Sequence, residues 1–388
     1  MKFFFYLAFA FHLGIFSQTK DLVVLNSETS EGLDLVNVFY PKLNEGSITN
    51  ASGKVRIELR KDSLTFSHIN YSSSRVSYEN LSTIDTIYLV PKENTLSEVI
   101  VTNFDLKKKL RTTFENYSKY YPTLAITNES TYKEVYRTNN KLARLIQVQL
   151  KWWHKDYKYN FKKNLNKQSE FSLVEIDYSK ISNDSTLSKA GFIENKSLVP
   201  TFHLNYYILY LLDYCNEIYI DKLIKNENST KVIFTSDVFD NNEKIASLNK
   251  SELIFDEKGA IIYLKFILDY NNFSYEEYSE RKRTKYTGQT QRQIMELNFK
   301  QINNSIYNLS SYKSQLLGTI SYSGNTDSFD IRQELFITKS YKSKSIKNSE
   351  IIDLEKPFYE NITSYKNLEN KILLTSEELE FINDSINK

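Results

Sequence analysis

Apolar and polar residues alternate along most of the chain with the period of two that is typical of β-strands. Between residues 22 and 101 the alternating runs are short and are separated by turn-forming residues. The clearest corner is the polar stretch from Glu45 to Lys54, which holds Gly46 and Gly53. The runs expected to be strands are residues 21–25, 33–40, 55–60, 63–71, 86–90 and 98–102. This pattern predicts a small β-sandwich over residues 19–102.

The alternating runs become longer after one stretch with helical spacing. Leu106, Leu110, Phe114 and Tyr117 recur on one helical face and predict a helix over residues 105–121, with the basic residues at 107–111 on its solvated face. Runs expected to be strands follow at residues 132–137, 143–150, 152–161, 217–220, 230–235, 251–255, 260–266, 293–299, 312–322 and 329–337. They predict a large antiparallel sheet of roughly eight to ten strands over residues 103–388.

Two further segments predict helices that cover this sheet. Residues 202–214 form a strongly apolar segment, which favours a buried helix. Near the end of the chain Thr375 and Glu378 have the spacing of a capping box, and Leu374 is expected to pack on Leu379. The fold class is therefore mainly β, with a few covering helices.

The first residues of the chain have the pattern of an export signal. Lys2 precedes a short apolar run that ends at Ser17, which predicts a signal peptide over residues 1–18. No later run is long and apolar enough for a transmembrane helix, so the mature chain is expected to have no transmembrane span. The net charge of +2 gives nucleic-acid binding no electrostatic basis. Cys215 is the single cysteine and cannot form an intramolecular disulfide.

Residues 22–101 resemble the carboxypeptidase-like regulatory domain in the order of their landmarks. The resemblance rests on the corner with Gly46, Thr49 and Gly53 at the family's turn positions, on the runs 64–71 and 87–91 around it, and on the closing run 96–102. It implies a transthyretin-like β-sandwich in an exported or outer-membrane protein of bacteria with two membranes. In one departure, Asn70 stands where the family tends to have glycine, although asparagine also tolerates positive φ.

The family name invites a search for catalytic residues. The mature chain has three histidines, His68, His154 and His203, and none lies in an HExxH pattern, so a zinc peptidase is excluded. Cys215 with His203 could be a nucleophile and a base, but a single cysteine among apolar residues is more often buried packing. The carboxylate pairs Glu276–Glu277 and Glu377–Glu378 are expected to be solvated. We therefore expect no catalytic residue, no metal, no cofactor and no enzyme activity.

One aromatic cluster is a candidate for a binding site: Trp152, Trp153, Tyr157 and Tyr159. Aromatic side chains with polar spacers can stack on a sugar or line an acyl pocket. Core and surface packing is the alternative that requires no ligand. If the two adjacent tryptophans lie on one strand, they point to opposite faces, so at most one belongs to the core.

The residues after 105 resemble, more weakly, envelope proteins that pair the regulatory domain with a large antiparallel sheet, and the sheet is similar in outline to the half-barrels of lipoprotein carriers. We expect a non-enzymatic exported protein, in the periplasm or associated with the outer membrane, that acts through an envelope partner or a ligand, with the first domain as a docking or spacer module. The alternative is a carrier that binds a lipid, an acyl chain or a lipoprotein in the concave face of the large sheet. The carrier hypothesis predicts an apolar cavity of several hundred Å³ there.

Overall fold

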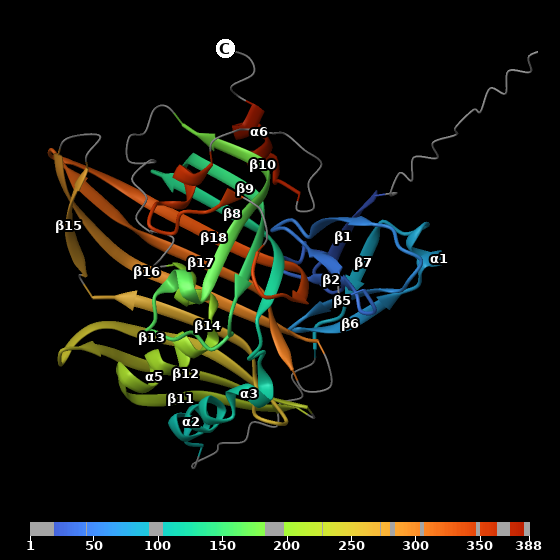
Figure 1. The fold of residues 1–388 in the computed structure, drawn as a ribbon, viewed down its shortest axis with the longest axis horizontal. Coiled ribbons are helices and arrows are strands. Elements are labelled where there is room, and N and C mark those ends of the chain that lie inside the picture. The colour runs from blue at the N-terminus through green and yellow to red at the C-terminus, as the bar shows by residue number, and fades with distance from the viewer. Residues whose placement is uncertain are drawn as a thin grey trace, which may run out of the picture.

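The structure is a computed structural model that describes residues 19–43, 45–92, 104–182, 198–226, 228–271, 273–279, 284–302, 306–346, 350–362 and 373–383 (Figure 1). The fold is mainly β, as the alternation predicts, with two small sheets, one large antiparallel sheet and a few helices. The expected signal peptide and the expected strand at residues 98–102 lie outside the described residues.

The first part of the chain forms a sandwich of two small sheets, with strand orders β4-β1-β7 and β3-β2-β5-β6 (Figure 1). Its elements are β1 (Thr19–Asn26), β2 (Asn37–Tyr40), β3 (Glu45–Ile48), β4 (Lys54–Glu58), β5 (Leu64–His68), β6 (Tyr71–Val76), α1 (Tyr78–Leu81) and β7 (Thr86–Leu89). Leu22, Val24, Val38, Val55 and Phe66 meet in its core, because alternate residues of each strand face inward. We refer to this sandwich as the small domain.

The polar stretch from Glu45 to Lys54 is only partly a corner. Its first four residues form β3, which pairs with β2, so a turn position for Gly46 is wrong. Gly46 lies opposite Phe39, and a Cβ atom there would lie 2.5 Å from the carbonyl oxygen of Val38. Gly53 has a φ of +74°, in the left-handed region expected of a turn glycine.

Within the described residues the large sheet contains twelve antiparallel strands in the order β11-β12-β13-β14-β16-β17-β18-β8-β9-β10-β19, with β15 paired to β16. Its strands are β8 (Ile126–Thr138), β9 (Lys141–His154), β10 (Ser169–Ile181), β11 (Cys215–Asn226), β12 (Ser229–Asp240), β13 (Glu243–Asp256), β14 (Ile261–Tyr270), β15 (Ser274–Ser279), β16 (Thr284–Gln301), β17 (Tyr307–Tyr322), β18 (Asn325–Lys342) and β19 (Glu350–Ile351). The sequence does not predict β10, because two register irregularities opposite β9 break its alternation.

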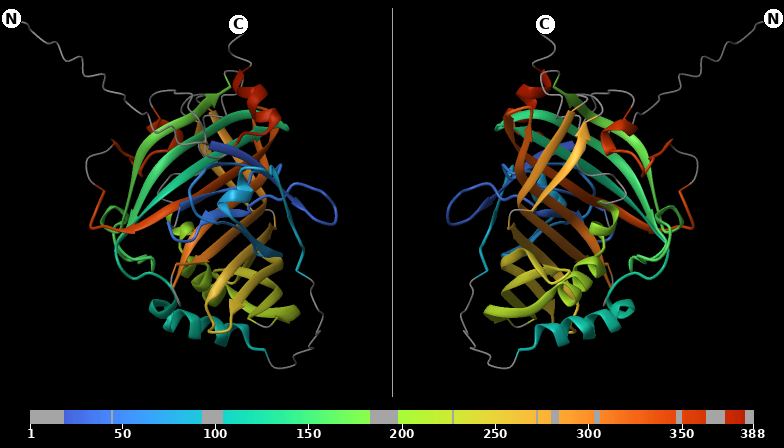
Figure 2. Two further views of the ribbon diagram at one scale, coloured as in Figure 1. Left: turned by 90° about the vertical axis from the view of Figure 1, so that its right-hand side faces the viewer. Right: turned by 90° about the vertical axis from the view of Figure 1, so that its left-hand side faces the viewer.

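The sheet is strongly curved, and helices fill its concave face (Figure 2). These helices are α2 (Leu106–Glu115), α3 (Tyr117–Tyr120), η3 (Val199–Phe202), α5 (Leu204–Asp213) and η4 (Phe358–Asn361), and a 3-10 turn, η1 (Leu165–Lys167), precedes β10. The helix predicted over residues 105–121 is present but is interrupted at Asn116. The buried helix predicted over residues 202–214 is α5. We refer to residues 106–120, 198–213 and 350–362 as the inner cover.

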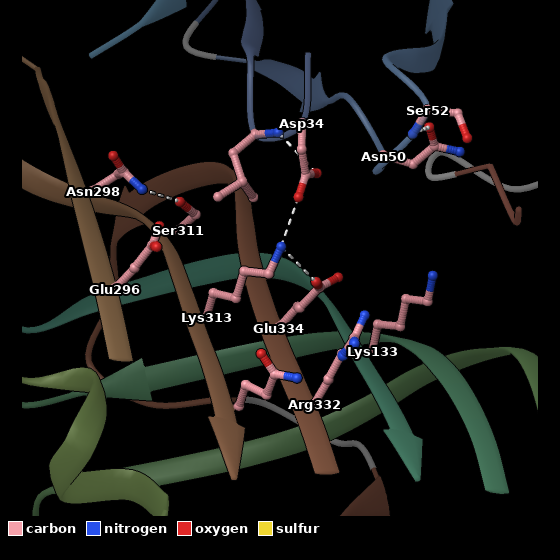
Figure 3. A network of polar contacts seen from close by, with 12 residues as sticks. Asp34, Asn50, Ser52, Lys133, Glu296, Asn298, Ser311, Lys313, Arg332 and Glu334 are labelled. Atoms are coloured by element: carbon pink, nitrogen blue, oxygen red, sulfur yellow. Dashed lines mark hydrogen bonds and ion pairs between the residues drawn. The ribbon is translucent and has the colours of Figure 1, made fainter. Parts of the chain in front are cut away.

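The small domain docks on the convex face of the sheet. Tyr312 of β17 belongs to the concave-face core, so the next residue, Lys313, points to the other face. Lys313 Nζ lies 2.6 Å from Asp34 Oδ2 of the small domain and 3.4 Å from Glu334 Oε1 of β18 (Figure 3). Ile48 packs on Phe336 beside this ion-pair triad.

The last helix, α6 (Ser376–Asn383), also packs on the convex face. The capping box is confirmed, because Thr375 N donates to Glu378 Oε2 at 2.9 Å and Glu378 N donates to Thr375 Oγ1 at 3.4 Å. The expected contact of Leu374 with Leu379 is wrong, since Leu379 is exposed and Leu374 packs in a cluster with Ile382. The expectation that Glu378 is solvated is also wrong, because it is buried against Lys133.

Candidate binding site on the concave face

The four candidate aromatic residues do not lie on one strand. β9 ends at His154, and the chain then turns, so the strand expected over residues 152–161 is wrong beyond His154. Asp156 Oδ1 accepts a hydrogen bond from Lys158 N at 2.8 Å, which forms a local turn. Tyr157 N donates to Pro122 O at 3.2 Å, which directs Tyr157 back towards the sheet.

The two adjacent tryptophans point to opposite faces of β9, as a strand requires. Trp152 is buried in the concave-face core, and its Nε1 donates to Ser169 Oγ at 2.9 Å. Trp153 lies on the convex side, where its Nε1 donates to Ser343 O at 3.2 Å. Trp153 is buried as well but contributes to none of the described hydrophobic clusters. Of the two, only Trp152 belongs to the candidate site.

Trp152, Tyr157 and Tyr159 meet around His203, a residue of the inner cover. The His203 ring centroid lies 5.5 Å from that of Trp152, 5.4 Å from Tyr157 and 5.1 Å from Tyr159. His203 Nδ1 lies 3.0 Å from Val199 O, which favours the tautomer that donates to this carbonyl. Burial lowers the pKa of His203 to about 4, so the ring is neutral near pH 7. The site is thus a packed aromatic cluster with an imidazole at its centre.

His154 is the residue of this cluster that sequence reasoning missed as a site residue. Its side chain is fully buried, and its ring centroid lies 4.9 Å from that of Trp152 and 5.7 Å from that of Tyr157. Among the described residues, neither His154 ring nitrogen makes a hydrogen bond of regular geometry, although the Asp156 backbone interacts with the ring. Burial and, to a smaller extent, nearby His203 together lower the pKa of His154 to about 3, while the Asp156 backbone acts in the opposite direction.

A second buried polar group faces the same side of the sheet. Asn128 of β8 lies directly opposite Trp152, so the pleat places both side chains on the concave face. Asn128 Oδ1 accepts hydrogen bonds from Asn308 Nδ2 at 3.2 Å and from Ser340 Oγ at 2.7 Å. Within the described part of the chain, the Nδ2 donor of Asn128 is left without a partner. No local sequence signal marks Asn128, because its role depends on the pairing of distant strands.

The concave face holds a small apolar gap beside this cluster. Its volume is about 20 Å³, far less than the several hundred Å³ that the carrier hypothesis predicts, so that prediction is wrong for the structure as described. Phe171 and Phe202 belong both to the gap and to the ring contacts of Trp152. The surface of the gap is apolar, and its lining consists of Tyr132, Leu150, Phe171, Leu198, Val199, Phe202, Ile352, Leu354 and Phe358.

One buried ion pair lies near the gap. Arg144 NH2 lies 2.7 Å from Glu134 Oε1, and both side chains are almost completely buried. Glu134 Oε2 also accepts hydrogen bonds from Tyr132 OH at 3.0 Å and from Gln333 Nε2 at 3.3 Å. The Arg144 guanidinium lies 4.7 Å from the ring centroid of Tyr359 in the inner cover. The pair therefore joins the sheet to the segment that covers it.

Cys215, the cysteine of the chain, lies buried at the start of β11. Burial raises the pKa of the Cys215 thiol, and a buried thiol with a raised pKa is a poor nucleophile. In the described ranges no three His, Cys, Asp or Glu side chains are arranged to hold a metal ion. No helix in the same ranges has the length and apolar character needed to span a membrane.

A second hollow, of about 250 Å³, lies between the small domain and the end of β18. Its floor includes Val38 and Leu64, and its rim carries charges of both signs. Lys339 Nζ lies 2.7 Å from Glu45 Oε1 on this rim, so oppositely charged groups there neutralise each other. The hollow thus has no single charge that would select a ligand.

Comparisons with known proteins give no family assignment. No protein-family model matches the chain, and no curated protein matches it. The resemblance of residues 22–101 to the carboxypeptidase-like regulatory domain therefore stays a prediction.

Solved structures give distant likenesses. A domain described as an outer membrane lipoprotein-sorting protein from Vibrio parahaemolyticus aligns with a TM-score of 0.26 at 10% identity, over 63% of this chain and 95% of that chain. A LolA superfamily protein from Nitrosomonas europaea aligns with a TM-score of 0.25 at 9% identity, over 63% of this chain and 96% of that chain. Lipovitellin aligns with a TM-score of 0.24 at 9% identity, over 59% of this chain and 26% of its own. TM-scores this low do not indicate a shared function. The function is therefore inferred from the geometry of this chain.

Proposed function

We propose that the chain is an exported, non-enzymatic carrier that holds an acyl chain between the concave face of the large sheet and the inner cover. The observation that carries the proposal is the apolar gap at the meeting point of separate chain segments. Strands β8 to β10, residues 198–202 and residues 352–358 all contribute to its lining. A hydrocarbon chain is the ligand class that such a lining favours.

The inner cover is attached in a way that permits opening. Residues 350–362 are joined to the sheet by the two-residue strand β19, which pairs with Ser172 and Leu173 of β10. Ile352 N adds one hydrogen bond to Phe171 O at 2.9 Å. Because few backbone hydrogen bonds join the described residues of this segment to the sheet, its local opening costs less than the separation of two long strands. We take the described state as the closed form of the carrier.

The free energy of burying an acyl chain is sufficient for such an opening. Each CH₂ group that leaves water contributes about 0.8 kcal/mol, so ten of them contribute roughly 8 kcal/mol. That exceeds the cost of many local opening events, which extends from near zero up to the global stability of a domain. The gap of the closed form thus marks where the acyl chain binds, and opening of the inner cover enlarges it to the space that the chain needs.

We prefer the carrier hypothesis to the hypothesis that the chain acts by binding a protein partner. The small domain contacts the large sheet of the same chain through β3 and Asp34. This contact covers a surface that the small domain, as a docking module, would need for a separate protein partner. Export rests on the signal pattern of residues 1–18. A periplasmic or outer-membrane location follows from the same proposal.

The test is titration of the mature chain with a dansyl-labelled fatty acid, followed by fluorescence. We expect saturable binding that Leu354→Phe weakens about tenfold by filling the gap and that Phe358→Ala strengthens by enlarging it. Leu268→Phe is the matched control, because Leu268 is buried in the same core on the distant strand β14. Circular dichroism shows whether each variant is folded. Absence of binding by the wild type, or equal effects of the two Phe substitutions, would refute the carrier function.

A further inference from the structure

We propose that His154 and Asn128 form a polar subsite that binds the uncharged head group of an acylglycerol, with the ester carbonyl and a free hydroxyl as the recognised groups. This inference rests on the proposed carrier function and specifies its ligand class. It starts from two side chains that are completely buried on the concave face and that leave three polar atoms without a regular hydrogen bond to any of the described residues. Buried polar atoms are paired in most proteins, so such a group calls for an explanation.

The two side chains are neighbours across the β8–β9 pair. His154 lies opposite Ile126, and Asn128 lies opposite Trp152, one pleat repeat further along. The diagonal between residues placed in this way spans about 7–8 Å, which one head group can bridge. Trp152 stands beside both and contacts Phe171 and Phe202, which line the apolar gap. An acyl chain in the gap would therefore direct its polar end towards this subsite.

The hydrogen-bonding capacity of the subsite is defined by its network. The bonds from Asn308 and Ser340 occupy Asn128 Oδ1, so Asn128 offers a donor through Nδ2. A neutral imidazole offers one N–H donor and one acceptor nitrogen. The subsite thus presents two donors and one acceptor. An ester carbonyl accepts from the donors, and a free hydroxyl of the glycerol donates to the acceptor.

The charge of the subsite separates an acylglycerol from a fatty acid. Asn128 is neutral, and the low pKa of the buried His154 keeps its ring neutral at ordinary pH. Lys300 is a cation that could attract a charged head group to the subsite. It lies opposite Asn308 in the β16–β17 register, and Asn308 is hydrogen-bonded to Asn128. Burial lowers the pKa of Lys300 to about 8, so a carboxylate head group is the competing outcome that the test must separate.

The experiment compares three ligands with the same hydrocarbon chain: monopalmitoylglycerol, methyl palmitate and palmitate. Displacement of the dansyl-labelled fatty acid gives the affinity of the mature chain for each. We expect monopalmitoylglycerol to bind about tenfold more tightly than methyl palmitate, because methyl palmitate lacks the hydroxyl groups. We also expect it to bind more tightly than palmitate.

Two substitutions assign this preference to the subsite. His154→Phe keeps an aromatic ring without polar atoms, and Asn128→Asp keeps Oδ1 but removes the amide donor. Each is expected to remove most of the preference for monopalmitoylglycerol while methyl palmitate still binds. His68→Phe is the matched control, because His68 is a partly buried histidine of the small domain with a pKa lowered to about 4. The ring-nitrogen NMR signals of His154 should also shift when monopalmitoylglycerol is added to the wild type.

The outcomes that overturn the inference differ from those that overturn the carrier function. Equal affinities for monopalmitoylglycerol and methyl palmitate, or tighter binding of palmitate, would refute the subsite while acyl binding still stands. A preference that survives both substitutions would refute the assignment to His154 and Asn128. Absence of binding by all three ligands would refute the subsite and the carrier function together.

Discussion

Lys133 of β8 and Glu378 of α6 form an ion pair that is buried on the convex face of the large sheet. Lys133 Nζ lies 2.7 Å from Glu378 Oε1, and each side chain is less than one-tenth exposed. Glu378 also closes the capping box of α6 through Thr375 N. One carboxylate therefore both begins the last helix and attaches it to a strand more than two hundred residues earlier in the chain.

Removal of one partner of this pair should release α6 from the sheet. Lys133→Met leaves Glu378 buried without its counter-charge, and breaking a buried pair in this way costs about 3–5 kcal/mol. Hydrogen exchange of the α6 amides should report the loss, with little change in the small domain. Arg137→Met is the control, since its partner Glu377 is largely exposed and the pair should contribute little. Equal protection of α6 in the wild type and in Lys133→Met would contradict the prediction.

The same pair makes the attachment of α6 sensitive to acid. Burial acts to raise the pKa of Glu378, but Lys133 and Thr375 together outweigh it and the pKa is lowered. A carboxyl with a lowered folded-state pKa stabilises the fold above its unfolded-state pKa, and this stabilisation is lost as the pH falls through the folded-state value. We expect α6 to lose protection below about pH 4. Glu378→Gln should remove this pH dependence.

The two histidines of the concave face should make the large domain less stable in mild acid. Their pKa values are lowered from 6.5 to about 3 for His154 and about 4 for His203, so the unfolded chain binds protons that the folded chain does not. Stability therefore falls as the pH decreases below about 6.5, by about 2 kcal/mol per histidine at about pH 5. Urea unfolding followed by Trp fluorescence measures this. His154→Phe should reduce the slope and raise the stability near pH 7 by about 1 kcal/mol, because it removes two buried nitrogens that make no regular hydrogen bond to the described residues.

The buried pair of Glu134 and Arg144 should be important for stability on the concave face. Arg144→Met leaves Glu134 with two neutral donors and no counter-charge, which should cost about 3–5 kcal/mol. The double variant Glu134→Gln with Arg144→Met should recover part of this loss, because no buried charge remains. Equilibrium unfolding of the four proteins of this cycle gives the coupling free energy. A double variant less stable than the sum of the single changes would contradict the assignment.

Docking of the small domain should depend on Lys313. Burial acts to lower the pKa of its ammonium, but Glu334 and Asp34 outweigh it and raise the pKa, so both carboxylates favour the charged form. Lys313→Met leaves Asp34 and Glu334 close together without a cation and should loosen the small domain from the sheet. Small-angle scattering and the rate of proteolysis between the domains measure this. Lys265→Met is the control, because Lys265 pairs with Glu296 within the large sheet.

The elements that depend on local pattern were predictable from the sequence. Alternation predicts most strands, and the spacing of Thr375 and Glu378 predicts the start of α6. Tertiary pairing was not predictable in the same way. Glu378 lies in a run of charged residues that is typical of a solvated surface, yet it is buried in an ion pair with Lys133. Tyr157 continues an alternating run, yet Asp156 and Pro122 turn the chain at that point.

The candidate site was predictable only in part. Trp152, Tyr157 and Tyr159 do meet, because large aromatic rings are stabilised by burial and the concave face of the large sheet is where they are buried. His154 and Asn128 have no local signal, since their proximity is created by the register of β8 against β9. Trp153 was a candidate only because it follows Trp152 in the sequence. The pleat of β9 directs its side chain to the opposite face of the sheet.

The position of β11 at the end of the strand order has a consequence for behaviour at high concentration. An unpaired edge strand can recruit the edge of a neighbouring molecule and start aggregation. β11 interrupts its own hydrogen-bond ladder at two irregularities, between Cys215 and Ile218 and between Ile220 and Lys222. It also carries the charged side chains of Glu217, Asp221 and Lys225. Irregular pairing and charged side chains are the features by which edge strands of natural proteins discourage such edge-to-edge growth.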